Sequence, residues 1–187
     1  PVREGMPDHH CEDVADFSGL VAEALGLDAE TVVRCRVAGW LHDIGKIAIP
    51  AEILAKPMSL TADEWRVMRT HAALGADIVA RIPALADAEP VVRHHHERFD
   101  GTGYPAGLAG THIPIEARIV AAADTFSAIV SNAPFRRAQN LATAIEELRR
   151  SGGSQLDPEV TEALCRVLES DTPDRRTRQH GRRPAGT

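Results

Sequence analysis

Two short segments of the sequence concentrate groups that can hold a metal ion or act on a phosphate. LHDIGK (41–46) places a histidine, an aspartate and a lysine within five positions, and HHERFDGTGYP (95–105) joins two adjacent histidines to a glycine-rich stretch. Apolar residues flank His42 and Asp43, and burying this pair without partners would cost several kcal/mol. A divalent metal ion would offset that cost, because imidazole supplies a nitrogen lone pair and a carboxylate can bridge two ions.

Other residues of the same types lie on separate predicted helices. A single histidine on an apolar helix face is more often a core residue than a ligand, but here imidazoles and carboxylates recur together. Such a set exceeds the roughly four to six positions around one ion, so two ions that share Asp43 are the economical arrangement. The candidate metal ligands are His10, His42, Asp43, His71, His95, His96 and Asp124.

The cysteines take no part in this set. Cys11, Cys35 and Cys165 are odd in number and widely spaced, so we expect reduced, partly buried thiols rather than a disulfide framework. A cluster without thiolates disfavours a structural zinc site. It suits iron first and manganese second, with zinc a weaker candidate.

The elements that must position these residues are predicted to be helices. Apolar residues recur mostly at three and four positions, which predicts an all-α fold, a helical bundle of about seven helices. Thr61 with Glu64 forms a capping box, and Asp157-Pro158 marks another helix start. The expected helices cover residues 8–25, 29–45, 61–82, 90–96, 115–130, 141–150 and 157–169.

Two of these helices carry apolar stripes that we expect to face the core. The stripe of the second helix consists of Val33, Val37, Trp40, Leu41 and Ile44. That of the third helix consists of Trp65, Met68, Ala72, Gly75, Val79 and Ile82.

Composition bounds the broader class. The 187 residues carry a formal net charge of −6, which argues against wide contact with nucleic acid, and no run reaches the ~20 apolar residues that span a bilayer. We therefore expect a cytoplasmic domain over residues 1–170 that binds neither nucleic acid nor membranes. Residues 171–187, rich in Arg, Pro and Gly, are expected to be a disordered linker to a fused regulatory or output domain, and exposed helix faces could support a homodimer.

The order H, HD-x-G-K, H, HHExxDGxGYP and D resembles the HD-GYP family, a branch of the HD phosphohydrolases. The match covers about residues 6–170, and HHERFDGTGYP is its most specific segment. The resemblance implies a helical HD-domain bundle around a dinuclear centre, with the seven candidates as ligands and Asp43 bridging. Members with a third metal place a Glu one turn before the first histidine, where this sequence has Met6, so two ions are implied.

The family's activity is hydrolysis of cyclic di-GMP to linear pGpG and in some members to GMP. The resemblance thus implies a phosphodiesterase in which metal-bound hydroxide attacks the phosphodiester, with Asp43 and Lys46 at the reaction centre. Lys46 would neutralise a phosphate oxygen, although an exposed lysine at a helix end is an alternative.

Substrate contacts are implied by the GYP loop and by a later basic pair. Tyr104, after Gly103, could stack on guanine or hydrogen-bond a phosphate, or it could pack a loop corner. Arg136 and Arg137 are candidate phosphate contacts, or solvated loop residues.

Two positions depart from the family pattern. Ser127 stands where relatives have an Asp, and Ala133 stands where they have an Arg. Losing an Arg–phosphate pair could weaken binding by about 1.5–3 kcal/mol. Two alternatives therefore stay open: hydrolysis of another cyclic dinucleotide or nucleotide phosphate, or a weakly active module that senses metal or cyclic dinucleotide.

Overall fold

The computed structural model describes residues 10–130 and 141–170. Within these ranges the chain forms eight α helices and three short 3-10 helices, and the only β pairing is an isolated bridge between Gly152 and Leu156. The all-α prediction is confirmed. The α helices are α1 (His10–Ala24), α2 (Ala29–Leu41), α3 (Ala51–Leu54), α4 (Ala62–Ala80), α5 (Glu89–His94), α6 (Ile115–Val130), α7 (Leu141–Ser151) and α8 (Pro158–Ser170), and the 3-10 helices are η1 (Ile44–Ala48), η2 (Pro83–Ala88) and η3 (Gly110–His112).

Capping groups start the helices where the sequence predicts. Thr61 accepts from the amide of Glu64, while the Glu64 carboxylate accepts from the amide of Thr61 at 2.7 Å, which completes the capping box of α4. Asp157 accepts from the amide of Glu159 at 2.8 Å at the start of α8. Because these bonds satisfy backbone donors that no helix can satisfy internally, they localise each helix start.

The region after α2 differs from the prediction of a helix to residue 45. The α helix ends at Leu41, and the chain continues through η1 and then the single-turn α3, which the sequence pattern did not predict. The reason is a close backbone approach: a Cβ on Gly45 would lie 1.9 Å from the carbonyl oxygen of His71 on α4. The chain must bend here to pass against α4, and only glycine leaves the room.

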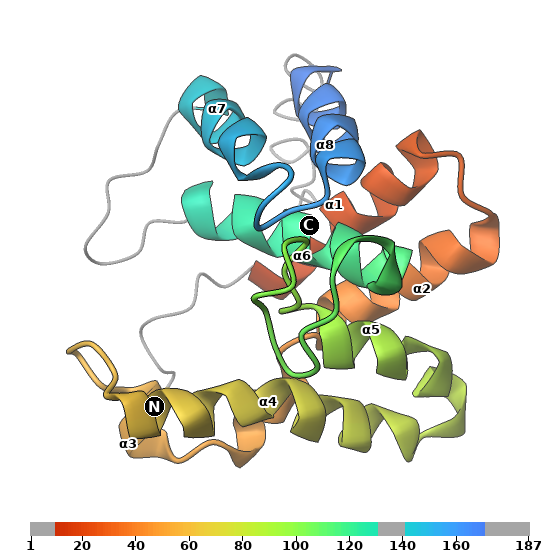
Figure 1. Cartoon of the computed structure of the whole chain (residues 1–187). Helices are drawn as coiled ribbons and strands as arrows, with labels where there is room; N and C mark the ends of the chain where they lie inside the picture. Colours follow the sequence, from red (N-terminus) through yellow and green to blue (C-terminus); the bar gives the residue numbers. More distant parts are fainter. Residues whose placement is uncertain (1–9, 131–140, 171–187) are drawn as a thin grey trace, which may run out of the picture.

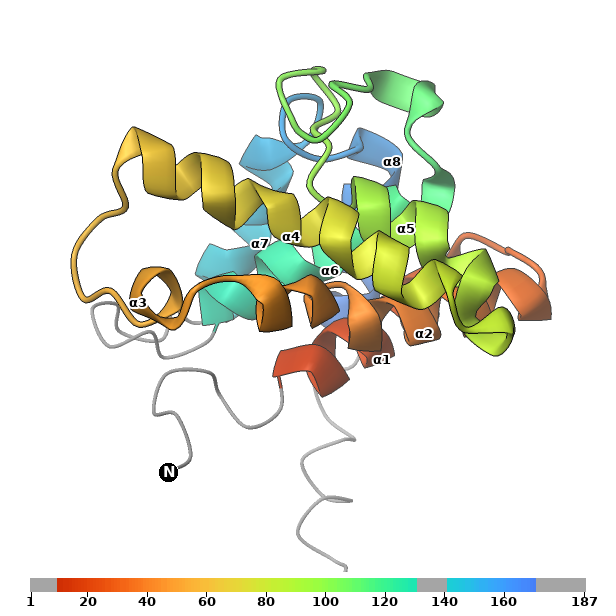
Figure 2. The same ribbon diagram turned by 90° about the horizontal axis from the view of Figure 1, so that it is seen from below.

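The core consists of two clusters that share their central helices (Figure 1). One cluster joins α1, α2 and α6 to α7 and α8, through residues such as Ile119, Leu148 and Leu164. The other joins the same three helices to α4 and α5, through Val14, Val79 and Val92. Figure 1 shows α4 and α5 below these three helices and α7 and α8 above them, and in Figure 2, seen from below, α4 and α5 lie in front. Therefore α1, α2 and α6 form the middle of the bundle, between these two groups of helices.

The buried face of α2 is only partly the predicted one, because Val37 and Leu41 of the stripe pack partly buried against the core but its other members on this helix do not. Val33 and Trp40 are 59% and 54% exposed, whereas Val32, Cys35 and Ala38 are buried. The small residues face inward because α1 and α2 pack closely: a Cβ on Gly39 would lie 2.7 Å from the Cα of Ala15. Apolar periodicity favoured the large side chains, but the close helix contact requires the small ones.

The stripe on α4 is correct only in its middle. Ala72, Gly75 and Val79 are buried, but Trp65 and Ile82 at the two ends are 47% and 44% exposed. Trp65 lies in the first turns of α4, which extend past the core, and Ile82 lies beyond the end of the helix at Ala80, so both side chains reach solvent.

The cysteines behave as predicted. All three are free; Cys35 and Cys165 are buried and Cys11 is partly buried. Burial raises the pKa of Cys35 to about 12, so this thiol stays protonated.

None of the helices in the described ranges is both long enough and apolar enough to cross a bilayer. Met6, Ala133, Arg136, Arg137 and the segment 171–187 lie outside the described residues, so the expectations attached to them stay predictions.

A buried ion pair joins the start of α6 to the start of α8, and it provides a test of the fold. Arg118 pairs with Asp157, and the side chains are only 13% and 4% exposed. We expect Arg118→Ala to lower the free energy of unfolding by about 3–5 kcal/mol, because it leaves a buried carboxylate without its counter-charge. Urea unfolding followed by circular dichroism measures this.

The matched control is Arg149→Ala, which removes an exposed arginine that pairs with Glu162 and Glu169 between α7 and α8. Solvent screens these pairs, so the control should unfold close to the wild-type midpoint. Equal losses in the two variants would contradict the structural role given to Arg118.

Candidate metal centre

The seven candidate ligands converge from five parts of the chain. Six of them form two sets that share Asp43, and within each set the potential ligand atoms lie within 4.8 Å of one another. Asp124 lies beside the second set, with Oδ1 3.3 Å from Nε2 of His10 and 3.8 Å from Nε2 of His42. The first set is Asp43, His71, His95 and His96, and the second is His10, His42 and Asp43.

Three of the imidazoles are oriented by backbone carbonyls of their own segments, two at helix ends and His71 within α4. In each, Nδ1 lies 2.7 Å from the carbonyl oxygen of the residue three positions earlier. A carbonyl only accepts, so Nδ1 carries the proton and Nε2 presents its lone pair to the cluster. The pairs are His42 with Gly39, His71 with Met68, and His95 with Val92.

His10 is held differently, by a side chain of α6. Its Nδ1 lies 2.8 Å from Oγ of Ser127, which is buried. Ser127 is one of the two departures from the family pattern, at a position where relatives have an Asp. The hydroxyl nevertheless contacts a candidate ligand and orients its ring, a role that only the contact between α1 and α6 reveals.

Unpaired polar atoms are concentrated in this cluster. Among the described residues four buried side-chain polar atoms have no hydrogen-bond partner, and three of them are Nε2 of His42, Oδ1 of Asp43 and Nε2 of His95. In addition, Nε2 of His71 faces Nε2 of His96 at 3.1 Å. Buried acceptor atoms without a hydrogen-bond donor destabilise the folded state. Divalent cations would coordinate these atoms, so the residues present fit a metal centre.

The protonation states also suit cation binding. Burial lowers the pKa of His71, more strongly that of His95, and that of His96 to about 4, so these rings are neutral near pH 7. Burial would raise the pKa of Asp43, but His42 and Lys46 hold it well below its usual range. Neutral imidazoles and an ionised carboxylate are the forms that ligate metals.

His42 is the exception among these rings. Burial acts to lower its pKa, yet the adjacent carboxylates of Asp43 and Asp124 raise it. An excess of negative charge at this position is what a bound cation would balance.

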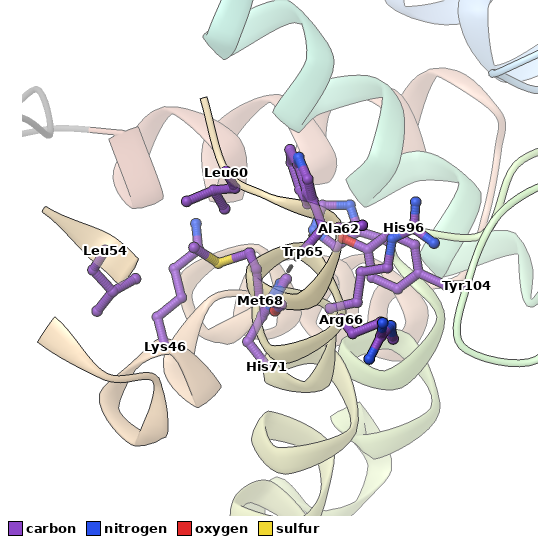
Figure 3. A pocket seen from close by; sticks show the side chains of 11 residues that line it. Lys46, Leu54, Leu60, Ala62, Trp65, Arg66, Met68, His71, His96 and Tyr104 are labelled. Atoms are coloured by element: carbon purple, nitrogen blue, oxygen red, sulfur yellow. Dashed lines mark hydrogen bonds between the residues drawn. The ribbon is translucent and has the colours of Figure 1, made fainter. Parts of the chain in front are cut away.

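Lys46 lies at the edge of the cluster. Its ammonium group pairs with Asp43, and its side chain also lines a pocket of about 960 Å³ beside the centre. Figure 3 shows Lys46 on one side of this pocket and His96 with Tyr104 on the other. We call it the α4 pocket; it is lined by Lys46, Leu54, Leu60, Ala62, Trp65, Arg66, Met68, Arg69, His71, His96 and Tyr104.

Tyr104 of the GYP segment stands over the centre. Its ring centroid lies 4.9 Å from that of His96, and the guanidinium of Arg69 lies 5.2 Å from it on the α4 side. Burial raises the pKa of Tyr104, so the phenol keeps its proton and can donate a hydrogen bond. Sequence reasoning did not single out Arg69, because nothing local marks an exposed helix arginine as a neighbour of this loop.

Glu97 organises the same loop and was also missed. It is buried at 4% exposure, and its carboxylate accepts from the amides of Ala106 at 2.7 Å and Leu108 at 3.1 Å. A buried carboxylate that receives backbone donors anchors the loop to the end of α5. In the sequence, Glu97 stands out only as an acidic residue directly after His95 and His96. That position does not indicate which backbone amides its carboxylate accepts from.

The two glycines of the loop have different roles. Gly101 has φ of 79°, a conformation that favours glycine. Gly103 has no positive φ; instead, a Cβ there would lie 2.3 Å from the amide nitrogen of Arg98. Gly103 therefore allows close packing of the loop against the backbone of Glu97 and Arg98.

A second pocket, of about 420 Å³, lies on the other side of Tyr104. It shares His96 and Tyr104 with the α4 pocket and continues along α6 toward α7. We call it the α6 pocket; it is lined by His95, His96, Glu97, Arg98, Tyr104, Ala121, Asp124, Thr125, Ala128, Ile129, Glu147, Gln155 and Leu156.

Comparison with known proteins gives consistent matches over most of the chain. The family described as HD domain matches residues 5–160. The chain is 42% identical over 171 residues to the cyclic di-GMP phosphodiesterase response regulator RpfG of Xanthomonas campestris, covering 88% of this chain and 44% of that protein. It is 41% identical over 174 residues to a cyclic di-GMP phosphodiesterase of Thermotoga maritima, covering 92% and 47%. The chain thus spans less than half the length of these relatives.

Solved structures share the fold at lower identity. A cyclic GMP-AMP-specific phosphodiesterase of Vibrio cholerae has a TM-score of 0.72 at 17% identity, over 88% of this chain and 45% of that one. An HDGYP protein from Bdellovibrio bacteriovorus has a TM-score of 0.68 at 20% identity, over 86% and 52%. Together with the family match and the HHERFDGTGYP segment, these findings show that the chain belongs to the HD-domain family, in its HD-GYP branch.

Proposed function

We propose that this domain is a metal-dependent phosphodiesterase that hydrolyses cyclic di-GMP to linear pGpG, with further cleavage to GMP as a second step. The observation that carries the proposal is the pair of ligand sets that share the buried Asp43 beside a cationic pocket. The two relatives with 41% and 42% identity are named cyclic di-GMP phosphodiesterases, which supports the choice of substrate.

We propose His10, His42, Asp43, His71, His95, His96 and Asp124 as the ligands of two divalent ions, iron first and manganese second. When bound, such ions supply Lewis acidity that activates water and neutralises charge on a phosphoryl group. The chain itself supplies neutral imidazoles with fixed Nε2 lone pairs and the carboxylate of Asp43 between the two sets.

The α4 pocket is suited to the phosphodiester itself. Lys46, Arg66 and Arg69 give it positive charge, and Trp65 provides an exposed aromatic face near the cations. Lys46 would exchange its partner from Asp43 to a phosphate oxygen when Asp43 binds metal. Tyr104 would donate its phenol proton or stack on a base at the boundary of the pocket.

The choice of dinucleotide is the finer part of the proposal. A Vibrio cholerae relative with 35% identity over 159 residues is named a 3'3'-cGAMP-specific phosphodiesterase, so a mixed cyclic dinucleotide is the alternative substrate. Ala133, in place of an expected Arg, motivates that alternative and that of a weakly active sensor. The fused domain, the homodimer and the cytoplasmic location stay predictions.

Removing the shared carboxylate tests the reaction. We expect Asp43→Ala to reduce cyclic di-GMP hydrolysis by more than about a hundredfold, because both ligand sets lose a member and Lys46 loses its partner. Chromatography of the products, with anaerobically purified protein loaded separately with ferrous iron or manganese, measures the loss. The matched control is Asp77→Ala on the exposed side of α4, where the carboxylate pairs with Arg93. If Asp43→Ala retained full activity, the proposed reaction would be wrong.

Ser127→Ala tests whether the hydroxyl positions His10. Loss of a group that orients a ligand typically weakens metal affinity by about 10- to 100-fold. We expect metal content, measured after dialysis against a graded series of metal buffers, to fall in this range while the fold is retained. Ser127→Thr, which keeps the hydroxyl, should recover affinity if the larger side chain fits. Unchanged affinity in Ser127→Ala would show that the contact has no role in metal binding.

Acidification should destabilise the metal-free protein. The pKa values of His71, His95 and His96 are lowered in the folded state, that of His96 to about 4, while the unfolded chain has values near 6.5. Between these values the unfolded state binds more protons, so the stability present above about pH 6.5 falls as the pH drops toward 4. The pKa of His42 is raised, so this one residue acts in the opposite direction. The three histidines with lowered pKa values outnumber it.

Thermal unfolding in the presence of a chelator, at intervals from pH 7 to pH 4.5, measures the effect. Each additional proton bound by the unfolded state contributes a slope of about 1.4 kcal/mol per pH unit. His96→Asn should flatten the curve, since it removes one of the titrating rings. A melting temperature independent of pH over this interval would contradict the prediction.

A further inference from the structure

The α6 pocket differs in chemistry from the α4 pocket, although both open onto the same centre. The α4 pocket offers cations and an aromatic face, whereas the α6 pocket has hydrogen-bonding side chains, Thr125, Glu147 and Gln155, around an apolar floor that includes Ile129 and Leu156. Polar side chains placed beside an apolar surface can fix the orientation of one flat ligand group.

Internal hydrogen bonds determine which groups of this pocket remain available. The hydroxyl of Thr125 donates to the carbonyl of Ala121 at 2.8 Å, so it can only accept from Gln155 at 3.3 Å. The side-chain amide of Gln155 must therefore point its NH₂ group at Thr125. Its Oε1 is left as an acceptor.

Glu147 of α7 is the second acceptor. Its side chain lines the pocket and is half-buried, and among the described residues its carboxylate has no hydrogen bond or ion pair; the backbone oxygen alone is used, by the hydroxyl of Ser151 at 3.0 Å. A carboxylate that faces a pocket without a partner is available for a ligand with adjacent N–H donors. Arg98 also lines the pocket, but its guanidinium pairs with Asp100 at 2.9 Å.

We propose that the α6 pocket binds one base of the cyclic dinucleotide and that Glu147 makes it prefer guanine to adenine. Guanine presents N1–H and an exocyclic amine side by side, and one carboxylate can accept from both. Adenine presents an acceptor at N1, which would face the lone pairs of Glu147. The proposal rests on the proposed function for the substrate class and adds how the two purines are distinguished.

The α6 pocket lies next to the metal centre, which suits the binding of a base in it. His95, His96 and Asp124 of the metal centre are also part of its lining, so a nucleotide whose phosphate lies at the centre has its base within reach. Tyr104 lies between this base and the α4 pocket, because it lines both pockets. The two bases of one substrate would thus meet different surroundings.

Glu147→Gln tests the proposal, because the amide keeps the shape of the side chain and removes the charge. We expect the preference for cyclic di-GMP over cyclic di-AMP, taken as the ratio of kcat/KM values and of calorimetric Kd values, to fall about ten- to a hundredfold. Cleavage of bis(p-nitrophenyl) phosphate, which has no base, should stay unchanged. The control is Glu146→Gln, a neighbouring exposed glutamate outside the pocket lining.

The two proposals fail in different ways. If the wild type hydrolyses both dinucleotides equally, or if Glu147→Gln keeps the wild-type preference, Glu147 is not a specificity residue while the phosphodiesterase stands. If the wild type hydrolyses neither dinucleotide but binds cyclic di-GMP with a preference that Glu147→Gln removes, the base site is supported and the phosphodiesterase is not. If it neither binds nor cleaves either one, both proposals are wrong.

Discussion

The buried carboxylate of Asp43 is the constraint on which the rest of this structure depends. It belongs to both ligand sets, and one of its oxygens has no hydrogen-bond partner among the described residues. An ionised group at this depth requires compensating positive charge, and Lys46 supplies only part of it. The helices around Asp43 therefore do more than bury apolar surface: they bring histidines with available lone pairs to one point.

That convergence depends on close backbone packing on both sides of the His42–Asp43 pair. Gly39 lies against α1 and Gly45 lies against α4, and neither contact tolerates a Cβ without movement of the backbone. Because three of the histidines bond to the carbonyl three residues before them, the ring orientations follow the backbone. A shift of any of these helices would move the Nε2 lone pairs with it. The positions of the candidate ligand atoms therefore depend on the packing of the helices.

The predictable parts of the molecule were those determined by local chemistry. Capping groups such as Thr61 and Asp157 predicted helix starts, and residue types singled out seven candidate ligands, whose side chains lie close together in the fold. The rotation of α2 was not predictable, because the large side chains of Val33 and Trp40 dominate the apolar pattern while the contact with α1 demands small ones. The roles of Ser127 and Glu97 depend on contacts between distant segments, which no local pattern encodes.

The pockets on the two sides of Tyr104 have different linings, and this difference also comes from contacts between distant segments. The GYP segment follows His96 within the same short motif, and the amide of Tyr104 donates to the carbonyl of His96 at 3.2 Å, so its presence at the centre is a local consequence of the motif. What lies on either side of it comes from elsewhere: Trp65 and Arg69 from α4, and Thr125, Glu147 and Gln155 from the second half of the chain. The surroundings of the centre can thus differ from one side to the other, because most of the pocket walls come from other positions than the candidate ligands. Chemistry and base recognition are therefore separable by mutation in this fold.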